Sequence, residues 1–490
     1  MNKSELTPRG VFEQFARINE IPRPSKREEK MIAYLQKWGE SHQLETVTDE
    51  TGNVIIRKPA TKGYENRETV VLQSHMDMVC DKLVDVDFDF DNDPIQTEVV
   101  TDEHGDAWLK AKGTTLGADD GIGCAIELAL LDADDIEHGP IECVFTRDEE
   151  TGLTGAEGMK SGFMTGKLLI NLDSEDEGQV FVSCAGGRNT LATFRYQREE
   201  LGKDWFFLTV SLKGLRGGHS GDDINKKRAN AIKILSRFLY LTDERFDLRL
   251  ASLDSGKLHN AIPRDGVAVF AIPEKHKEDV RSAWNIFTAE VEDEYHVTDT
   301  EMVFRMESAD RCPVIEETVG RNMIRALQAV DNGVFAMCQD KDIDWLVETS
   351  SNLASVHTEE HTATVLSSQR SNVMSNLDNQ AATVKALYQL AGAEVVQGDG
   401  YPAWKMKKDS ALRDVVVSTY RTLFGHDPKV LGIHAGLECG LFSEKYPDMD
   451  MVSFGPTLRD VHTPQERCLV KTVQMVWDHL LLILKNIPEK

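Results

Sequence analysis

The chain has 490 residues, more than one hydrophobic core usually supports, so we expect two domains. A formal net charge of −27 disfavours nucleic acids and anionic membranes as partners, because both are themselves negatively charged. The eight cysteines include no C-x-x-C pair, which argues against a thiolate zinc site and favours a reducing compartment. The first residues lack the apolar run of a signal peptide, and no segment resembles a membrane span. We therefore expect a cytoplasmic protein.

The first part of the chain predicts helices and strands in alternation. Apolar residues at helical spacing predict a helix around 11–21, and Ser25-Lys-Arg-Glu28 has the pattern of a capping box that begins a helix ending near Trp38. Short apolar runs predict strands, and an Ala-rich run predicts a helix: strands 53–57, 69–76, 141–146 and 168–172, and helix 121–131. Alternating strands and helices indicate a mostly parallel sheet that is covered on both faces, so we assign residues 1–186 to an α/β domain.

The pattern changes after Cys184. The next region predicts half-exposed strands and two helices: strands 205–212 and 267–272, and helices 230–241 and 274–291. Gly-Asp-Gly400-Tyr-Pro402 is typical of a linker, and the βα pattern resumes after it: helices 409–423, 437–445 and 472–487, and strands 429–433 and 451–454. We therefore expect an α+β domain, 187–400, inserted into an α/β domain whose second part is 401–490.

Acids and histidines lie at the ends of apolar runs in five places. The segments are His75-Met-Asp77, Gly117-Ala-Asp119-Asp120-Gly121, Asp-Glu149-Glu150-Thr-Gly152, Asn-Leu-Asp173 and Asp-Val-His462-Thr-Pro. Each segment alone fits a surface loop, a helix cap or a turn. Five together indicate one site at the carboxyl ends of a sheet, with oxygen and nitrogen ligands that suit a divalent metal such as zinc.

The spacing within these segments suggests which residues bind metal and which have a supporting or catalytic role. His75 and Asp77 point to the same face of a strand, so the carboxylate can support the imidazole. Asp119 has two oxygens and could bridge two metals. Because a turn follows Glu149 and Glu150, one can bind metal while the other exchanges a proton with the attacking water.

Two further segments are candidate substrate contacts. Gly217-Gly-His219-Ser-Gly221 presents a histidine in a glycine-rich loop, and Ser-Ser-Gln-Arg370-Ser-Asn372 presents an arginine suited to bidentate carboxylate binding. A turn and a surface charge are the alternative interpretations of these two segments.

These residues, in this order and over the whole chain, resemble the dinuclear zinc peptidases of the M20 type. Within that family the chain looks like the bacterial dipeptidases that cleave Xaa-His dipeptides such as carnosine. The resemblance implies two Zn²⁺ per chain that activate a bridging water, with Co²⁺ or Mn²⁺ as possible substitutes. It implies the following ligands: Asp119 bridging both ions, His75 and Asp173 completing one site, and Glu150 and His462 completing the other.

The resemblance also implies the catalytic roles. Glu149 is the general base and Asp77 orients His75. The inserted domain is a lid in which His219 stabilises the oxyanion, Asn260 assists it, and Arg370 holds the terminal carboxylate of the substrate. The resemblance further implies a cis peptide bond between Asp119 and Asp120 and a homodimer. Whether His219 acts within its own chain or across the dimer stays open, since the lid is longer than in typical dimeric relatives.

Other functions are kept as alternatives. A related M20-type peptidase or aminoacylase would use the same site on another peptide or acyl-amino acid. The segment 357–361 matches the inverted zincin pattern H-x-x-E-H, but β-type residues flank it and favour a hairpin. An oxidoreductase would need a third glycine where the chain has Ile126, and a serine hydrolase would need a final glycine at Asp222. An inactive binding protein is disfavoured because Glu149 and every proposed ligand are present.

Overall fold

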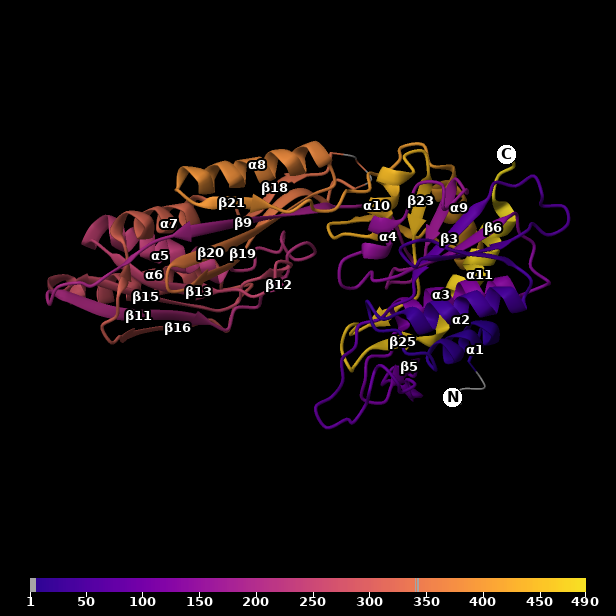
Figure 1. Cartoon of the computed structure of the whole chain (residues 1–490), viewed down its shortest axis with the longest axis horizontal. Coiled ribbons are helices and arrows are strands. Elements are labelled where there is room, and N and C mark those ends of the chain that lie inside the picture. Colours follow the sequence, from indigo (N-terminus) through magenta and orange to yellow (C-terminus); the bar gives the residue numbers. More distant parts are fainter. Residues whose placement is uncertain (1–5, 340, 342) are drawn as a thin grey trace. The chain divides into compact units, whose positions relative to one another are not determined.

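The computed structural model describes residues 6–339, 341 and 343–490, which form two compact units (Figure 1). The first unit comprises the chain up to Ser183 together with Trp404–Gly432 and Leu437–Lys490, and the second comprises Cys184–Ala403 and Ile433–Gly436. The sequence-based boundaries, 186/187 and 400/401, lie three residues from two of these breaks. The return of Ile433–Gly436 to the second unit was not predicted.

Within the described residues, the first unit is built on an eight-stranded sheet. In sheet order its strands are β1 (Glu45–Thr48), β2 (Val54–Lys58), β6 (Ile141–Thr146), β3 (Val70–His75), β7 (Leu168–Asn171), β23 (Asp450–Ser453), β8 (Gln179–Cys184) and β22 (Lys429–Ile433). The α/β class is confirmed, and parallel pairing joins the four central strands β6, β3, β7 and β23. The edge strand β1 pairs antiparallel with β2, because the turn between them is too short for a crossover, and β2 pairs antiparallel with β6.

Helices cover this sheet. They are α1 (Arg9–Ile18), α2 (Glu29–Ser41), α3 (Ala118–Asp132), α4 (Thr154–Gly158), α9 (Ala411–Phe424), α10 (Glu438–Lys445) and α11 (Val470–Asn486). Every residue of β3, β6, β7 and β23 is buried, as expected for strands that are covered on both faces. A smaller sheet carries the order β24 (Leu458–Arg459), β25 (Arg467–Leu469), β5 (Ala107–Ala111) and β4 (Thr97–Thr101). No described helix combines the length and apolarity needed to cross a bilayer.

The capping box predicted at Ser25 does not form. Helix α2 begins at Glu29, and the N-cap residue Glu28 makes no side-chain capping bond. The Ser25 hydroxyl instead donates to Asp77 Oδ2 at 2.8 Å, and Glu28 pairs with Arg147 at 2.7 Å. A tertiary contact therefore uses the serine that the sequence pattern assigned to a local helix cap.

The second unit is an antiparallel sheet with helices packed on it. Its strand order is β16 (Val303–Ser308), β11 (Trp205–Lys213), β15 (Gly266–Pro273), β13 (Arg249–Ser255), β19 (Val347–Thr358), β20 (Thr362–Ser371), β9 (Gly186–Arg195) and β21 (Glu394–Gln397), with β18 (Gly333–Met337) beside β19. Helices α5 (Ala231–Phe246), α6 (Lys277–Glu294), α7 (Glu317–Ala329) and α8 (Met374–Leu390) share one apolar core with the sheet. This is the α+β pattern expected from the half-exposed strands.

The H-x-x-E-H segment lies on the hairpin of β19 and β20. His357 belongs to β19, whereas Glu360 and His361 lie in the turn that follows it. Because that motif needs a helix to bring both histidines to one metal, the inverted zincin alternative is excluded, as the flanking residues predicted.

Candidate metal centre

Three neighbouring parallel strands place a histidine and two acids at the carboxyl ends of the first sheet. Strand β3 ends at His75, β6 ends three residues before Glu149, and β7 ends two residues before Asp173. Because the carboxyl ends of parallel strands meet at the same edge, the side chains that follow these strands are brought together.

The side chain of Asp119 lies between two histidines. Asp119 is the second residue of α3 and follows Gly117 by two positions; the φ of Gly117, 66°, is in the left-handed region. His75 Nε2 is 3.1 Å from Asp119 Oδ1, and His462 Nε2 is 3.1 Å from Asp119 Oδ2. Each carboxylate oxygen therefore faces a different imidazole, which is the geometry of a bridging ligand. The Asp119–Asp120 peptide bond is cis, as the resemblance implied.

Two ligand groups share this carboxylate. His75, Asp119 and Asp173 form one group, and Asp119, Glu150 and His462 form the other; within each, the ligand atoms lie within 4.8 Å of one another. His75 Nε2 is 3.5 Å from Asp173 Oδ1, and His462 Nε2 is 3.0 Å from Glu150 Oε2. Two overlapping sets of three N and O ligands fit two divalent ions with one bridge.

The electrostatics of the groups also favour a bound cation. Burial by itself lowers the pKa of His75, but the carboxylates of Asp173 and Asp119 outweigh burial and raise that pKa well above its usual value. Hydrogen bonds to Asp119 and Glu150 raise the pKa of His462 to about 11. Burial raises the pKa of Asp173 to about 7. A buried cluster of carboxylates that draws protons onto both histidines offers a strongly favourable place for positive charge.

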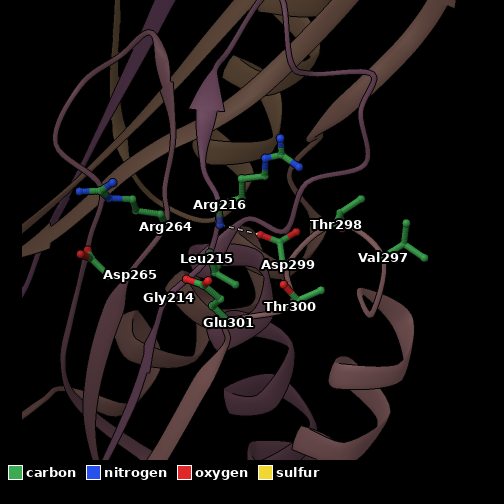
Figure 2. Close-up of a pocket in the computed structure, with 10 residues that line it drawn as sticks. All are labelled: Gly214, Leu215, Arg216, Arg264, Asp265, Val297, Thr298, Asp299, Thr300 and Glu301. Atoms are coloured by element: carbon green, nitrogen blue, oxygen red, sulfur yellow. Dashed lines mark hydrogen bonds between the residues drawn. The ribbon is translucent and has the colours of Figure 1, made fainter. Parts of the chain in front are cut away.

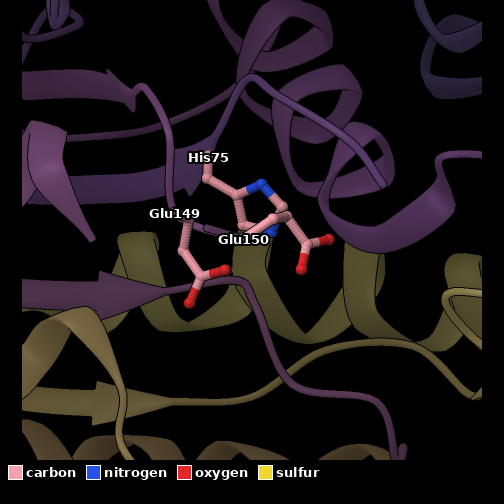
Figure 3. Close-up of side chains that lie close together, drawn as sticks. All are labelled: His75, Glu149 and Glu150. Atoms are coloured by element: carbon pink, nitrogen blue, oxygen red, sulfur yellow. The ribbon is translucent and has the colours of Figure 1, made fainter. Parts of the chain in front are cut away.

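The adjacent glutamates point their carboxylates in different directions (Figure 3). The Glu150 side chain is 5% exposed, and its buried Oε1 has no hydrogen-bond partner among the residues that the structure describes, as suits a metal ligand. Burial raises the pKa of Glu149 well above its usual value. The structure therefore separates a carboxylate beside His462 from a neighbour that is poised to hold a proton.

Asp77 is fully buried behind the site. Its Oδ1 lies 3.5 Å from His75 Nδ1 and accepts the Glu149 backbone N–H at 3.1 Å. Its Oδ2 accepts from Ser25 Oγ at 2.8 Å and from the Glu150 backbone N–H at 3.4 Å. The Asp77 carboxylate thus contacts the His75 ring and the backbone N–H groups of Glu149 and Glu150. Sequence reasoning missed Ser25, which no local pattern connects with Asp77.

The other three predicted site residues lie in the second unit. His219 belongs to the short strand β12 (Gly218–His219), which pairs with β14 (Ala261–Ile262), and the Ser220 backbone N–H donates to Asn260 O at 2.8 Å. His219 Nδ1 accepts the backbone N–H groups of Gly221 and Asp222 at 3.3 and 3.2 Å. When the ring is neutral, its proton is therefore on Nε2, which is a donor.

Arg370 is 5% exposed and lies beside the same loop. Its Nε donates to Ser220 Oγ at 3.4 Å and its Nη1 to Tyr401 Oη at 2.8 Å. Within the described residues no carboxylate forms an ion pair with it. His434 stands nearby, with Nε2 2.7 Å from Ser350 Oγ; burial, together with the positive charge of Arg370, lowers the pKa of His434 to about 3. Tyr401 and His434 were not predicted, since they come from segments distant in sequence.

A buried acid anchors the backbone before and after β12, the short strand that carries His219. Asp299 is 2% exposed and accepts the backbone N–H of Arg216 at 2.8 Å (Figure 2). It also accepts the backbone N–H of Ala229 at 3.0 Å. A hollow of about 650 Å³ opens beside this anchor; both acidic and basic residues line it, and the lining includes none of the predicted site residues.

Comparisons with known proteins match nearly the whole chain. The family model "Peptidase family M20/M25/M40" matches residues 71–486. The chain is 38% identical to the cytosol non-specific dipeptidase of Escherichia coli, over 99% of each chain. The crystal structure of aminoacylhistidine dipeptidase from Vibrio alginolyticus matches with 42% identity and a TM-score of 0.90, covering 100% of this chain and 99% of that one.

More distant structures share the fold. Aminopeptidase PepT from Bacillus cereus has 16% identity and a TM-score of 0.56, covering 98% of this chain and 99% of that one. The family model and the two near full-length relatives show that the chain is a metallopeptidase and belongs to the peptidase family M20/M25/M40.

Proposed function

We propose that this peptidase is a dizinc dipeptidase that hydrolyses Xaa-His dipeptides such as carnosine. The observation that carries the proposal is the Asp119 carboxylate placed between His75 and His462, 3.1 Å from each. The name of the Vibrio relative, aminoacylhistidine dipeptidase, supports the choice of substrate.

Five side chains would hold the two ions. His75, Asp119 and Asp173 would hold one, and Asp119, Glu150 and His462 the other. Two Zn²⁺ would polarise the scissile carbonyl and lower the pKa of a water molecule. The oxygen-rich ligand set also suits Co²⁺ or Mn²⁺.

Glu149 is the general base in this proposal. It takes a proton from the attacking water and gives it to the amine that leaves. Burial favours the protonated state of its carboxyl group, so the proton is kept close to the site between the two transfers. Asp77 orients His75 and, through the Glu149 backbone N–H, also fixes the start of the glutamate turn.

The second unit supplies the substrate contacts and acts as the lid. Because Nδ1 of His219 accepts two backbone N–H groups, Nε2–H is available to donate to an oxyanion, and Asn260 adjoins this loop. Among the described residues, the buried guanidinium of Arg370 is hydrogen-bonded only to the hydroxyls of Ser220 and Tyr401, which suits it to the terminal carboxylate of a dipeptide.

A second candidate is a broader M20-type activity on other dipeptides or on acyl-amino acids. The E. coli relative is named a non-specific dipeptidase, which favours a site that recognises the terminal carboxylate of the substrate more strongly than an imidazole side chain. Binding of the substrate carboxylate by Arg370 is expected for both candidate functions, so rates on different substrates must distinguish them.

The test is hydrolysis of β-alanyl-histidine by the purified protein, before and after chelation and after return of zinc. Alanyl-alanine and N-acetyl-histidine serve as matched substrates without imidazole and without a free amine. Activity lost on chelation, restored by zinc and highest for β-alanyl-histidine supports the first candidate. Equal rates on both dipeptides favour the broader one, and no cleavage of any substrate by the zinc-loaded protein contradicts both.

Location and assembly belong to the same proposal. The name of the E. coli relative, cytosol non-specific dipeptidase, supports a cytoplasmic location. The homodimer rests on the family resemblance alone, and light scattering of the purified protein tests it directly: a monomer mass would contradict it.

A further inference from the structure

The loop that carries Asp119 is held by a buried acid, Glu466, which lies in the segment between β24 and β25. Its side chain accepts four consecutive backbone N–H groups. Glu466 Oε2 accepts from Leu116 at 2.7 Å and from Gly117 at 3.0 Å, and Oε1 accepts from Ala118 at 2.8 Å and from Asp119 at 3.3 Å. Glu466 is 2% exposed, so water contributes little to the solvation of its carboxylate.

A buried cation holds the same loop through its carbonyl group. Arg23 is 1% exposed, and its Nη2 donates to Gly117 O at 2.6 Å, while its Nη1 donates to Asp77 O at 2.9 Å. The fit is close: a Cβ added at Gly117 would lie 2.4 Å from Nη2, and one added at Gly121 would lie 2.6 Å from it. Glycines at both positions therefore make room for the guanidinium.

The two backbone polar groups of Gly117 are therefore hydrogen-bonded to side chains of opposite charge. Its N–H meets Glu466 and its C=O meets Arg23. The same two side chains also connect the loop to other parts of the centre, because Arg23 binds the Asp77 carbonyl and Glu466 follows His462 by four residues. The backbone that leads into the bridging carboxylate has little freedom to shift.

We propose that Glu466, supported by Arg23, is a positioning residue that pre-orients Asp119 for both metal ions. The inference rests on the proposed dinuclear centre. Neither side chain belongs to the two proposed ligand groups; each acts through the backbone of Leu116–Asp119. Residues that orient metal ligands in this way typically contribute about 10–100-fold to metal affinity.

The experiment is Glu466→Gln, with zinc affinity measured by competition with a chromogenic chelator and zinc content by elemental analysis. Glutamine keeps the size but turns one acceptor into an NH₂ group that would face two backbone N–H donors. We expect zinc to bind about 10–100-fold more weakly at both sites, since the bridging ligand belongs to both. Arg23→Lys keeps the charge with fewer donors and is expected to weaken zinc in the same direction.

Glu142→Gln is the matched control. Glu142 is also buried and accepts the backbone N–H groups of Thr165 and Gly166 at 2.7 and 3.1 Å, with Arg57 at 3.0 Å, and none of these partners is a proposed metal ligand. We expect this change to lower the melting temperature of the metal-free protein but to leave zinc affinity unchanged. A merely structural role for Glu466 would give the same result in both variants.

The outcomes separate the two proposals. Zinc affinity of folded Glu466→Gln within threefold of the wild-type value overturns the positioning role, and so does equal weakening in Glu142→Gln. Should Glu466→Gln yield no folded protein, Glu466→Asp, which keeps the charge on a shorter side chain, must show the weakening instead, and unchanged affinity there overturns the role. Failure of the wild-type protein to bind zinc at all would contradict the dinuclear centre itself.

Discussion

Replacing each of the adjacent glutamates by glutamine separates proton transfer from metal binding. Glutamine has nearly the same size as glutamate but cannot take up a proton at its side chain. Glu150 Oε2 lies 3.0 Å from His462 Nε2, in the group shared with Asp119, whereas Glu149 belongs to neither of the two groups that contain Asp119. We therefore expect Glu149→Gln to keep both metal ions and Glu150→Gln to lose one.

The expected loss of rate follows from the role of Glu149. General-base catalysis contributes about 10²–10⁴-fold in rate, which corresponds to about 3–5.5 kcal/mol of transition-state stabilisation. Because the Glu149 backbone N–H, and not its carboxylate, binds Asp77, the substitution leaves the support of His75 intact. The loss should therefore fall on kcat, with KM changing little.

The assay is kcat for β-alanyl-histidine together with zinc content of the same samples. A fully zinc-loaded Glu149→Gln protein with kcat within tenfold of the wild-type value would refute the base assignment. Loss of one ion from Glu149→Gln, with both retained by Glu150→Gln, would show that the two roles are reversed.

Three further predictions concern the surroundings of the site and the fold. Ser25→Ala removes a hydrogen bond to the Asp77 carboxylate that is worth about 1.5–3 kcal/mol. We expect a urea titration to show destabilisation of that order and kcat to fall. An unchanged urea midpoint and an unchanged kcat would contradict this prediction. Arg370→Lys loses the planar pair of donors, so KM for a free dipeptide should rise while KM for its C-terminal amide stays the same; equal changes for both would contradict carboxylate binding. Burial lowers the pKa of His479 to about 4, while its Nε2 lies 2.9 Å from Val416 O. The unfolded chain then binds more protons between pH 6.5 and 4, so up to about 3 kcal/mol of stability is present above pH 6.5 and is lost as pH falls to 4. His479→Gln should shrink this loss in denaturant titrations across that range, and an identical pH profile would contradict it.

Local patterns were sufficient for much of the fold. Strands β6 and β22 have the predicted bounds, 141–146 and 429–433, because a short apolar run between turn residues is a property of the segment itself. The ligand segments were equally readable, since an acid or histidine directly after a buried strand needs no knowledge of distant partners. The resemblance to a known family supplied the roles of these residues, and the structure places the five proposed ligands together.

Hydrogen-bond partners that come together only in the folded chain could not be predicted from the sequence. Ser25 has the pattern of a helix cap but binds Asp77, and Arg23 reaches Gly117 across 94 positions of sequence. Glu466 looks like one acid among 82 acidic residues until four backbone N–H groups converge on it. The sequence by itself determined which segments form strands and helices and which acids and histidines follow the strands, because these depend on neighbouring residues. Only the tertiary structure decided which buried charges hold the loop of Asp119 in place, because a hydrogen bond depends on the positions of both its partners in space, whatever their separation in the chain.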